Sequence, residues 1–180
     1  DYLTYHVNGW NAVAATSVSI ASLESVGNFV LFDDQQNYFP YYTGKLTSVT
    51  LGNDSTPFTI GTDDASNAYP FTIYECDQLS TVNALGLTTV YGDVSISYAD
   101  SLSDLTGFDS LTTVGGALTL SSLGGLLSLS GLEALTSVAE HFEIAYNDAL
   151  SSIAGLSGLT TVGIEDGGKI GRASCRERVC

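Results

Sequence analysis

No arrangement of side chains in this sequence matches a familiar pattern for acid–base or nucleophilic catalysis. The two histidines, His6 and His141, are separated by most of the chain, and neither belongs to a Gly-x-Ser-x-Gly, His-Glu-x-x-His or Cys–His pattern. Polysaccharide lyases need basic side chains to meet the carboxylates of their substrates, and here Lys45 is nearly alone. Hydrolysis of a neutral glycan by two carboxylates stays open on grounds of charge, but no acidic pair stands out. We therefore expect a protein without enzymatic activity and without a cofactor.

Aspartates provide the most regular set of potential metal ligands. Three of them recur at one position of a repeat: Asp77, Asp100 and Asp148. Aligned carboxylates could bind calcium, but Gly124 takes this position in one repeat, and Asp and Gly share a tolerance for tight turns. We interpret the column as turn chemistry. Two further acidic pairs lie in no Asp-x-Asp-x-Asp-Gly loop and are interpreted as solvated surface charge: Asp33-Asp34 and Asp63-Asp64. No metal site is predicted.

A 24-residue repeat positions these residues. The unit reads L-x-x-V-x-x-x-Φ-x-Φ-x5-L-x-x-Φ-x-G-Φ-x-x, where Φ is apolar. Its most regular columns are leucine and valine: Leu87, Leu111, Leu135 and Leu159; Val90, Val114, Val138 and Val162. One further unit precedes Leu87 with one residue deleted, and the register blurs before Phe71. A threonine column follows the leucines and suggests either an ice-binding ladder or, as we prefer, corner side chains that bond to the backbone: Thr88, Thr112, Thr136 and Thr160.

The Φ-x-Φ part of each unit has the alternation of a β-strand, with two side chains inward and a polar one outward. It recurs as Val94-Ser95-Ile96, Leu118-Thr119-Leu120 and Phe142-Glu143-Ile144. The rest of the unit is too short, and too rich in Ser, Thr, Gly and Asp, for a long helix. The sequence predicts a mainly β protein, a right-handed parallel β-solenoid of ~24-residue coils with strands ~4.8 Å apart. Regular coils are placed at 71–169, and irregular, aromatic-rich coils or a cap at 1–70.

The last eleven residues, IGRASCRERVC at 170–180, differ in composition from everything before them. They hold three of the five basic residues and two of the three cysteines. The string resembles the translation of a sequencing-library adapter, and we interpret it as an artefact. Without it the chain keeps two lysines and 19 acidic residues, so the net charge is 2 − 19 = −17. Cys76 is then the sole cysteine, and no disulfide framework is predicted.

The charge of the chain limits its partners. With 20 acidic and five basic residues the formal charge is −15, so DNA, RNA and heparin would be repelled, and nucleic-acid binding is excluded. No run of 18 apolar residues and no basic region before an apolar stretch is present, so we expect neither a membrane span nor a signal peptide in this segment. Methionine is absent, and we interpret the chain as a processed product or a fragment whose flanking domains are missing.

Two segments of the sequence resemble a known family: GLTTVYGDVSISYADSLSDLTGFDSLTTVGGALTLSS and GLEALTSVAEHFEIAYNDALSSIAGLSGLTTVG. They resemble the receptor L-domain family, a branch of the leucine-rich-repeat-like solenoids, over about residues 71–165. Ala139 and Glu140 replace the usual Gly-Gly, and Asn147 stands in the family's Asn column. In the other coils that column holds Cys76, Ala99 and Leu123. The resemblance implies an extracellular or cell-surface setting and recognition without catalysis.

Two groups of residues are candidates for ligand binding. The first is the outward strand column with one tyrosine beside it: Thr72, Ser95, Thr119, Glu143 and Tyr74. The second is an aromatic cluster that would bind a sugar or protein if exposed and cap the core if buried, which we favour: Tyr38, Phe39, Tyr41 and Tyr42. We predict a recognition or adhesion module that binds a protein or glycan. The alternatives are a structural spacer that displays another domain, and a glycan-active β-solenoid enzyme.

Overall fold

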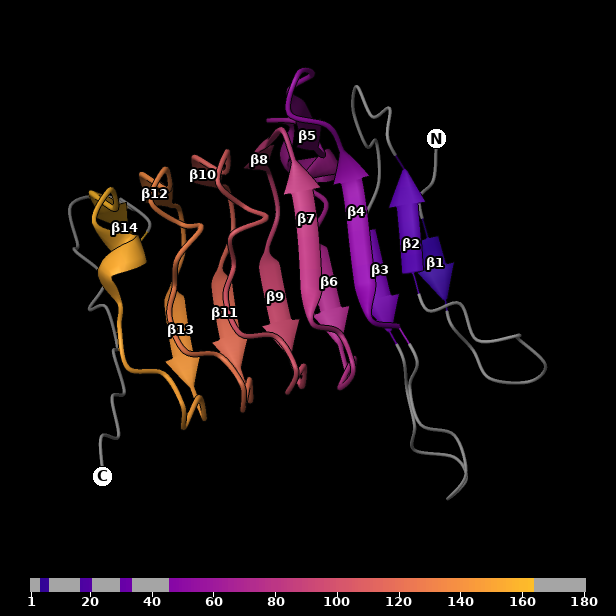
Figure 1. Ribbon diagram of the computed structural model, residues 1–180. Helices are drawn as coiled ribbons and strands as arrows, with labels where there is room; N and C mark the ends of the chain where they lie inside the picture. The colour runs from indigo at the N-terminus through magenta and orange to yellow at the C-terminus, as the bar shows by residue number, and fades with distance from the viewer. Residues whose placement is uncertain (1–3, 7–16, 21–29, 34–45, 164–180) are drawn as a thin grey trace.

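The computed structural model describes residues 4–6, 17–20, 30–33 and 46–163, and in these residues the protein is mainly β. The strands form three sheets in which neighbouring strands are parallel, as Figure 1 shows. The prediction of a mainly β protein with parallel strands is confirmed. The described residues contain two short 3-10 helices, η1 (Ala65–Asn67) and η2 (Ala154–Leu156), and no helix that could span a membrane.

The largest sheet, sheet A, contains the strands predicted from the Φ-x-Φ pairs. Val94 pairs with Leu118, and Leu118 with Phe142, at the predicted spacing of 24 residues. Phe71 pairs with Val94 at 23 residues, as the single deletion requires. The strand order along sheet A is β1 (Thr4–His6), β3 (Val30–Asp33), β6 (Phe71–Tyr74), β9 (Val94–Ser97), β11 (Leu118–Ser121) and β13 (Phe142–Ala145).

The valine column builds a second sheet, sheet C. Its strands are β5 (Phe58–Ile60), β8 (Leu87–Val90), β10 (Thr113–Val114), β12 (Ser137–Val138) and β14 (Thr161–Val162). From β8 to β14 the chain alternates between sheets C and A. At the corner before β10, the Thr112 Oγ1 donates to the Thr88 carbonyl oxygen at 3.0 Å, and Thr136 and Thr160 repeat this bond. The threonine column is therefore explained by hydrogen bonds to the backbone of the preceding repeat.

The third sheet, sheet B, comes from the part of the chain where the repeat is hard to read. It consists of β2 (Ser17–Ile20), β4 (Ser48–Gly52) and β7 (Thr81–Leu85). Ser48 pairs with Thr81 at a spacing of 33 residues, and in sheet C Phe58 pairs with Leu87 at 29. Segment 1–70 thus contributes strands to all three sheets at spacings that differ from one repeat to the next.

The inward side chains of the sheets pack into one hydrophobic cluster. Leu87, Leu111 and Leu135 are each at most 1% exposed, as the leucine column predicts. The side chains are less buried toward β13. Leu118 and Leu120 of β11 are buried, whereas Phe142 and Ile144 of β13 are only partly buried. The glycine column keeps neighbouring segments close: a Cβ on Gly107, Gly131 or Gly155 would collide with the carbonyl oxygen of Val82, Leu105 or Leu129, respectively.

Candidate binding surface

The outward strand column predicted from the sequence lies in register across sheet A. Thr72 is paired with Ser95, Ser95 with Thr119, and Thr119 with Glu143. The first three side chains are half-buried and that of Glu143 is exposed. Tyr74 ends β6, and the positions paired with it in the next strands hold small side chains: Ser97, Ser121 and Ala145. The structure therefore brings five of the predicted residues onto one polar face.

Two tyrosines that the sequence analysis missed extend this face at the ends of the strands. Tyr98 follows β9 and Tyr146 follows β13, and their side chains are 48% and 80% exposed. The Tyr98 ring packs edge-on against the Tyr74 ring, with centroids 5.5 Å apart and an interplanar angle of 81°. Aromatic side chains with this much exposed surface are typical anchors of binding interfaces.

A repeated left-handed residue explains why these tyrosines point outward. The first residue after each of four strands has a positive φ: Glu75 (52°), Tyr98 (56°), Ser122 (56°) and Tyr146 (58°). Strand alternation alone would continue inward at these positions. The left-handed conformation, costing roughly 1–2 kcal/mol in a non-glycine residue, turns the side chain out and lets the following residue point inward. The recurrence of Tyr-x-Asp at 98–100 and 146–148 was the available signal in the sequence.

The third residue of the same turn belongs to the aspartate column. Asp100 Oδ1 accepts a hydrogen bond of 3.0 Å from the Gly124 amide of the next repeat, a contact between repeats that the sequence did not predict. Between Tyr146 and Asp148, Asn147 points inward: its Oδ1 accepts from the Leu123 amide at 2.8 Å, and its Nδ2 donates to the Leu120 carbonyl at 3.0 Å. The turns at 98–100 and 146–148 therefore each present an outward, an inward and an outward side chain.

The described part of the chain contains no Lys or Arg, and several of its carboxylates accept hydrogen bonds. Asp64 accepts from the Ser66 Oγ at 2.6 Å and from its amide at 2.9 Å, which lowers the pKa of Asp64. The hydroxyl of Thr106 likewise lowers the pKa of Asp104 at 2.7 Å. Burial raises the pKa of Asp109, reinforced by the neighbouring charges of Glu133, Asp104 and Asp54. Apart from histidine, the charged side chains of the described residues are all acidic.

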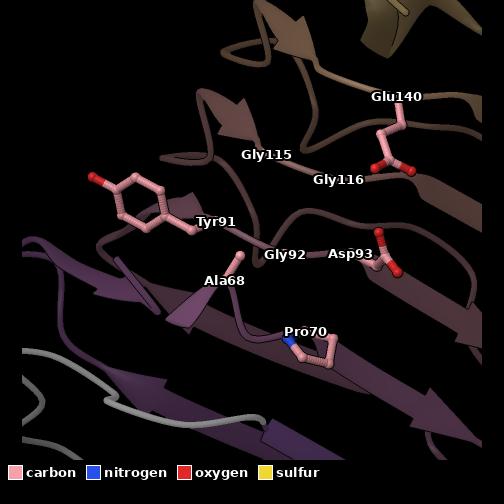
Figure 2. Close-up of a pocket in the computed structure, with 8 residues that line it drawn as sticks. All are labelled: Ala68, Pro70, Tyr91, Gly92, Asp93, Gly115, Gly116 and Glu140. Carbon is pink, nitrogen blue, oxygen red and sulfur yellow. The ribbon is translucent and has the colours of Figure 1, made fainter. Parts of the chain in front are cut away.

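A shallow depression lies on the turns between sheets C and A, before the strands of sheet A begin and away from Tyr98 and Tyr146, which follow these strands. Figure 2 shows the Asp93 and Glu140 carboxylates on one side of it and the Tyr91 ring on the other. Its volume is about 180 Å³, less than the ~300 Å³ at the lower end of ligand pockets. Asp93 Oδ1 already accepts from the Ala117 amide at 2.8 Å. The depression holds no nucleophile and base in contact, and we assign it to the packing of glycine-rich turns.

Other candidate residues lie apart from this surface or outside the described residues. His141 is exposed just before β13, and His6 ends β1. No group of three His, Cys, Asp or Glu residues in the described part of the chain is arranged to hold a metal ion. Cys76 is buried in the core. The aromatic cluster Tyr38, Phe39, Tyr41 and Tyr42, the pair member Asp34 and the tail 170–180 lie outside the described residues.

No protein-family model matches the chain, and no curated protein or solved structure matches it either. The function of the chain is therefore inferred from the side chains of sheet A and its turns.

Proposed function

We propose that this chain is a non-catalytic recognition or adhesion module that binds a protein or a glycan through the outward face of sheet A and the turns beside it. The observation that carries the proposal is the exposure of Tyr98 and Tyr146 beside the hydroxyl-bearing column of Thr72, Ser95 and Thr119. Exposed aromatic rings next to small polar side chains provide apolar contact area together with hydrogen-bonding groups.

The same proposal includes the architecture and setting of the module. We propose that the repeats are coils of a right-handed parallel β-solenoid of the receptor L-domain type, placed outside the cell or on its surface. The alternation of the chain between sheets C and A at 24-residue spacing supports this arrangement. A row of regular repeats gives an extended face, which is the feature that solenoid proteins use to bind partners.

The absence of paired catalytic groups in the described residues favours recognition over catalysis. The carboxylates of Asp64, Asp100 and Asp104 accept hydrogen bonds from backbone amides of turns, which is a structural role. A spacer would explain the small side chains of the outward column, but it gives no reason for two exposed tyrosines on strained backbone.

Protein and glycan arrays probed with the full labelled chain test this proposal. We expect a defined set of bound partners, and we expect Tyr98→Ala combined with Tyr146→Ala to abolish binding at unchanged thermal stability. Tyr91→Ala is the matched control, because this tyrosine lies beside the depression before β9, whereas Tyr98 and Tyr146 follow the strands of sheet A. An array on which nothing binds would support the spacer, and release of sugars from a neutral polysaccharide would support the enzyme; either result overturns the proposal.

A further inference from the structure

The two exposed tyrosines flank a turn position with a smaller side chain at the ends of strands β9, β11 and β13, and we call this position the notch. Tyr98 and Tyr146 hold the same turn position two strands apart, and the small side chain of Ser122 lies between them. Two strand spacings of ~4.8 Å place the Cα atoms of the tyrosines roughly 10 Å apart. A planar group stacked between two rings needs them only ~7–8 Å apart, because carbon atoms pack at ~3.5–4.0 Å. The notch therefore accommodates one side chain of a partner.

An aspartate follows each of the two tyrosines in the chain. Asp100 and Asp148 come two residues after the tyrosines, and the intervening Ala99 and Asn147 point inward, so ring and carboxylate share the outer side of each turn. The hydrogen bond from the Gly124 amide to Asp100 Oδ1 holds this carboxylate against the turn that follows β11. Asp100 Oδ2 takes no hydrogen bond from the described part of the chain. Gly124 adds no side chain that would cover it.

We propose that this notch binds an arginine or lysine side chain of a protein partner, which would be the anchor of the recognition function proposed above. The cation stacks on the faces of Tyr98 and Tyr146, and its N–H groups donate to the Asp100 and Asp148 carboxylates. Cations are attracted to the faces of aromatic rings and to carboxylates at once. Arginine fits better than lysine, because its planar guanidinium stacks on rings and donates two parallel hydrogen bonds.

The charge of the whole chain points to the same class of partner. The formal charge is −15, and no Lys or Arg lies in the described residues to neutralise the carboxylates of the notch. Such a field draws a basic segment toward the surface and accelerates its association. A neutral glycan could stack on the rings, but it would gain nothing from the negative charge.

Binding of short labelled peptides to the full chain tests the inference. The probes are a peptide of alternating Arg and Ser, its Lys and Glu counterparts, and an all-Ser peptide, each measured by fluorescence anisotropy at two salt concentrations. Tyr98→Leu keeps the apolar area and removes the aromatic ring, whereas Tyr98→Phe keeps the ring. Asp148→Asn removes one charge at the notch. Asp63→Asn is the matched control for Asp148→Asn. It also removes one charge, but near η1, which in Figure 1 lies at the end of the sheets opposite the turns that follow β9, β11 and β13.

We expect the Arg peptide to bind more tightly than the Lys peptide, and the Glu and all-Ser peptides not to bind. Tyr98→Leu should weaken the Arg peptide by about two- to fivefold, Tyr98→Phe should retain its affinity, and Asp148→Asn should weaken it more than Asp63→Asn. Equal losses in both Asp variants with no effect of Tyr98→Leu would show diffuse electrostatic attraction and overturn the inference. So would binding of neutral glycans on the arrays without any binding of basic peptides, which would leave the recognition function standing. If neither arrays nor peptides show binding, both proposals fall.

Discussion

Replacing Gly131 by alanine should lower the free energy of unfolding by about 3–6 kcal/mol, because two backbone segments touch at this glycine. Its φ is 104°, a conformation that costs a side-chain-bearing residue ~1–3 kcal/mol. A Cβ there would lie 2.5 Å from the Cα of Thr106 and would collide with the carbonyl of Leu105. Since carbon atoms pack at ~3.5–4.0 Å, the two segments would have to separate by about 1 Å.

This separation has two further costs. The hydrogen bond from the Leu105 amide to the Ser130 carbonyl, 2.9 Å long, would be stretched beyond its useful range, at a cost of about 1 kcal/mol. The buried side chains of Leu105, Leu129 and Leu132 lie on either side of the contact. A gap of ~0.5–1 Å removes a quarter to a half of the dispersion attraction across it, or about 1–2 kcal/mol for leucines worth roughly 1.5–3 kcal/mol each.

Urea unfolding followed by circular dichroism measures the effect, with Gly124→Ala as the matched control. A Cβ on Gly124 would first meet Asp100 Oδ1 at 3.0 Å, and this side-chain atom can move, so the control should lose less than about 1 kcal/mol. If the two variants unfold at the same urea concentration with equal slopes, the close approach of the backbones does not limit substitution at Gly131, and the reasoning is refuted.

Three smaller effects follow from the turns and corners of the repeat. Ser122→Gly should raise the free energy of unfolding by about 0.5–1 kcal/mol, because glycine adopts the φ of 56° without steric cost; thermal unfolding measures this. Thr136→Val should lower the free energy of unfolding by ~0.5–1 kcal/mol, because it removes the hydrogen bond from Oγ1 to the Thr112 carbonyl. The loss is small because that carbonyl still accepts a hydrogen bond of 2.9 Å from the Thr136 amide. Urea unfolding of this variant is compared with that of Thr136→Ser, which keeps the hydroxyl. Asp109→Asn should stabilise the protein slightly at pH 7, because partial burial and nearby carboxylates raise the pKa of Asp109 and penalise its ionised form in the folded state, while solvent screening keeps the effect small.

The pH dependence gives the Asp109 prediction its sign. The advantage of the asparagine should be complete above the raised pKa of Asp109, decrease as the pH falls through that value, and vanish below the unfolded value of 3.8. An advantage that grows toward acid pH would contradict it. A loss of stability in Ser122→Gly would mean that its side chain contributes more than the backbone costs. Equal stabilities of Thr136→Val and Thr136→Ser would remove the hydroxyl bond from the account of the threonine column.

Sequence reasoning predicted the strands of the candidate surface but only part of the surface itself. Thr72, Ser95, Thr119 and Glu143 could be aligned in advance, because side chains alternate along a strand and the apolar neighbours must be buried. Tyr98 and Tyr146 were missed, since their outward direction depends on a positive φ that no residue type requires. For the same reason the notch over Ser122 could not be predicted from composition or period.

The sequence alone determined the 24-residue register, the β-strands and the inward columns from Val94 onward, because burying one face of each strand restricts which residues occupy alternate positions. Only the tertiary structure showed which strands pair across the longer and uneven spacings before Phe71. Ser48 pairs with Thr81, and Phe58 pairs with Leu87, and neither pairing follows from a regular repeat. The tertiary structure also decided the role of Asp100, whose partner is the Gly124 amide of the next repeat. Periodic burial can be read along a chain, whereas a hydrogen bond or a ring contact between repeats depends on backbone angles that only the packed sheets fix.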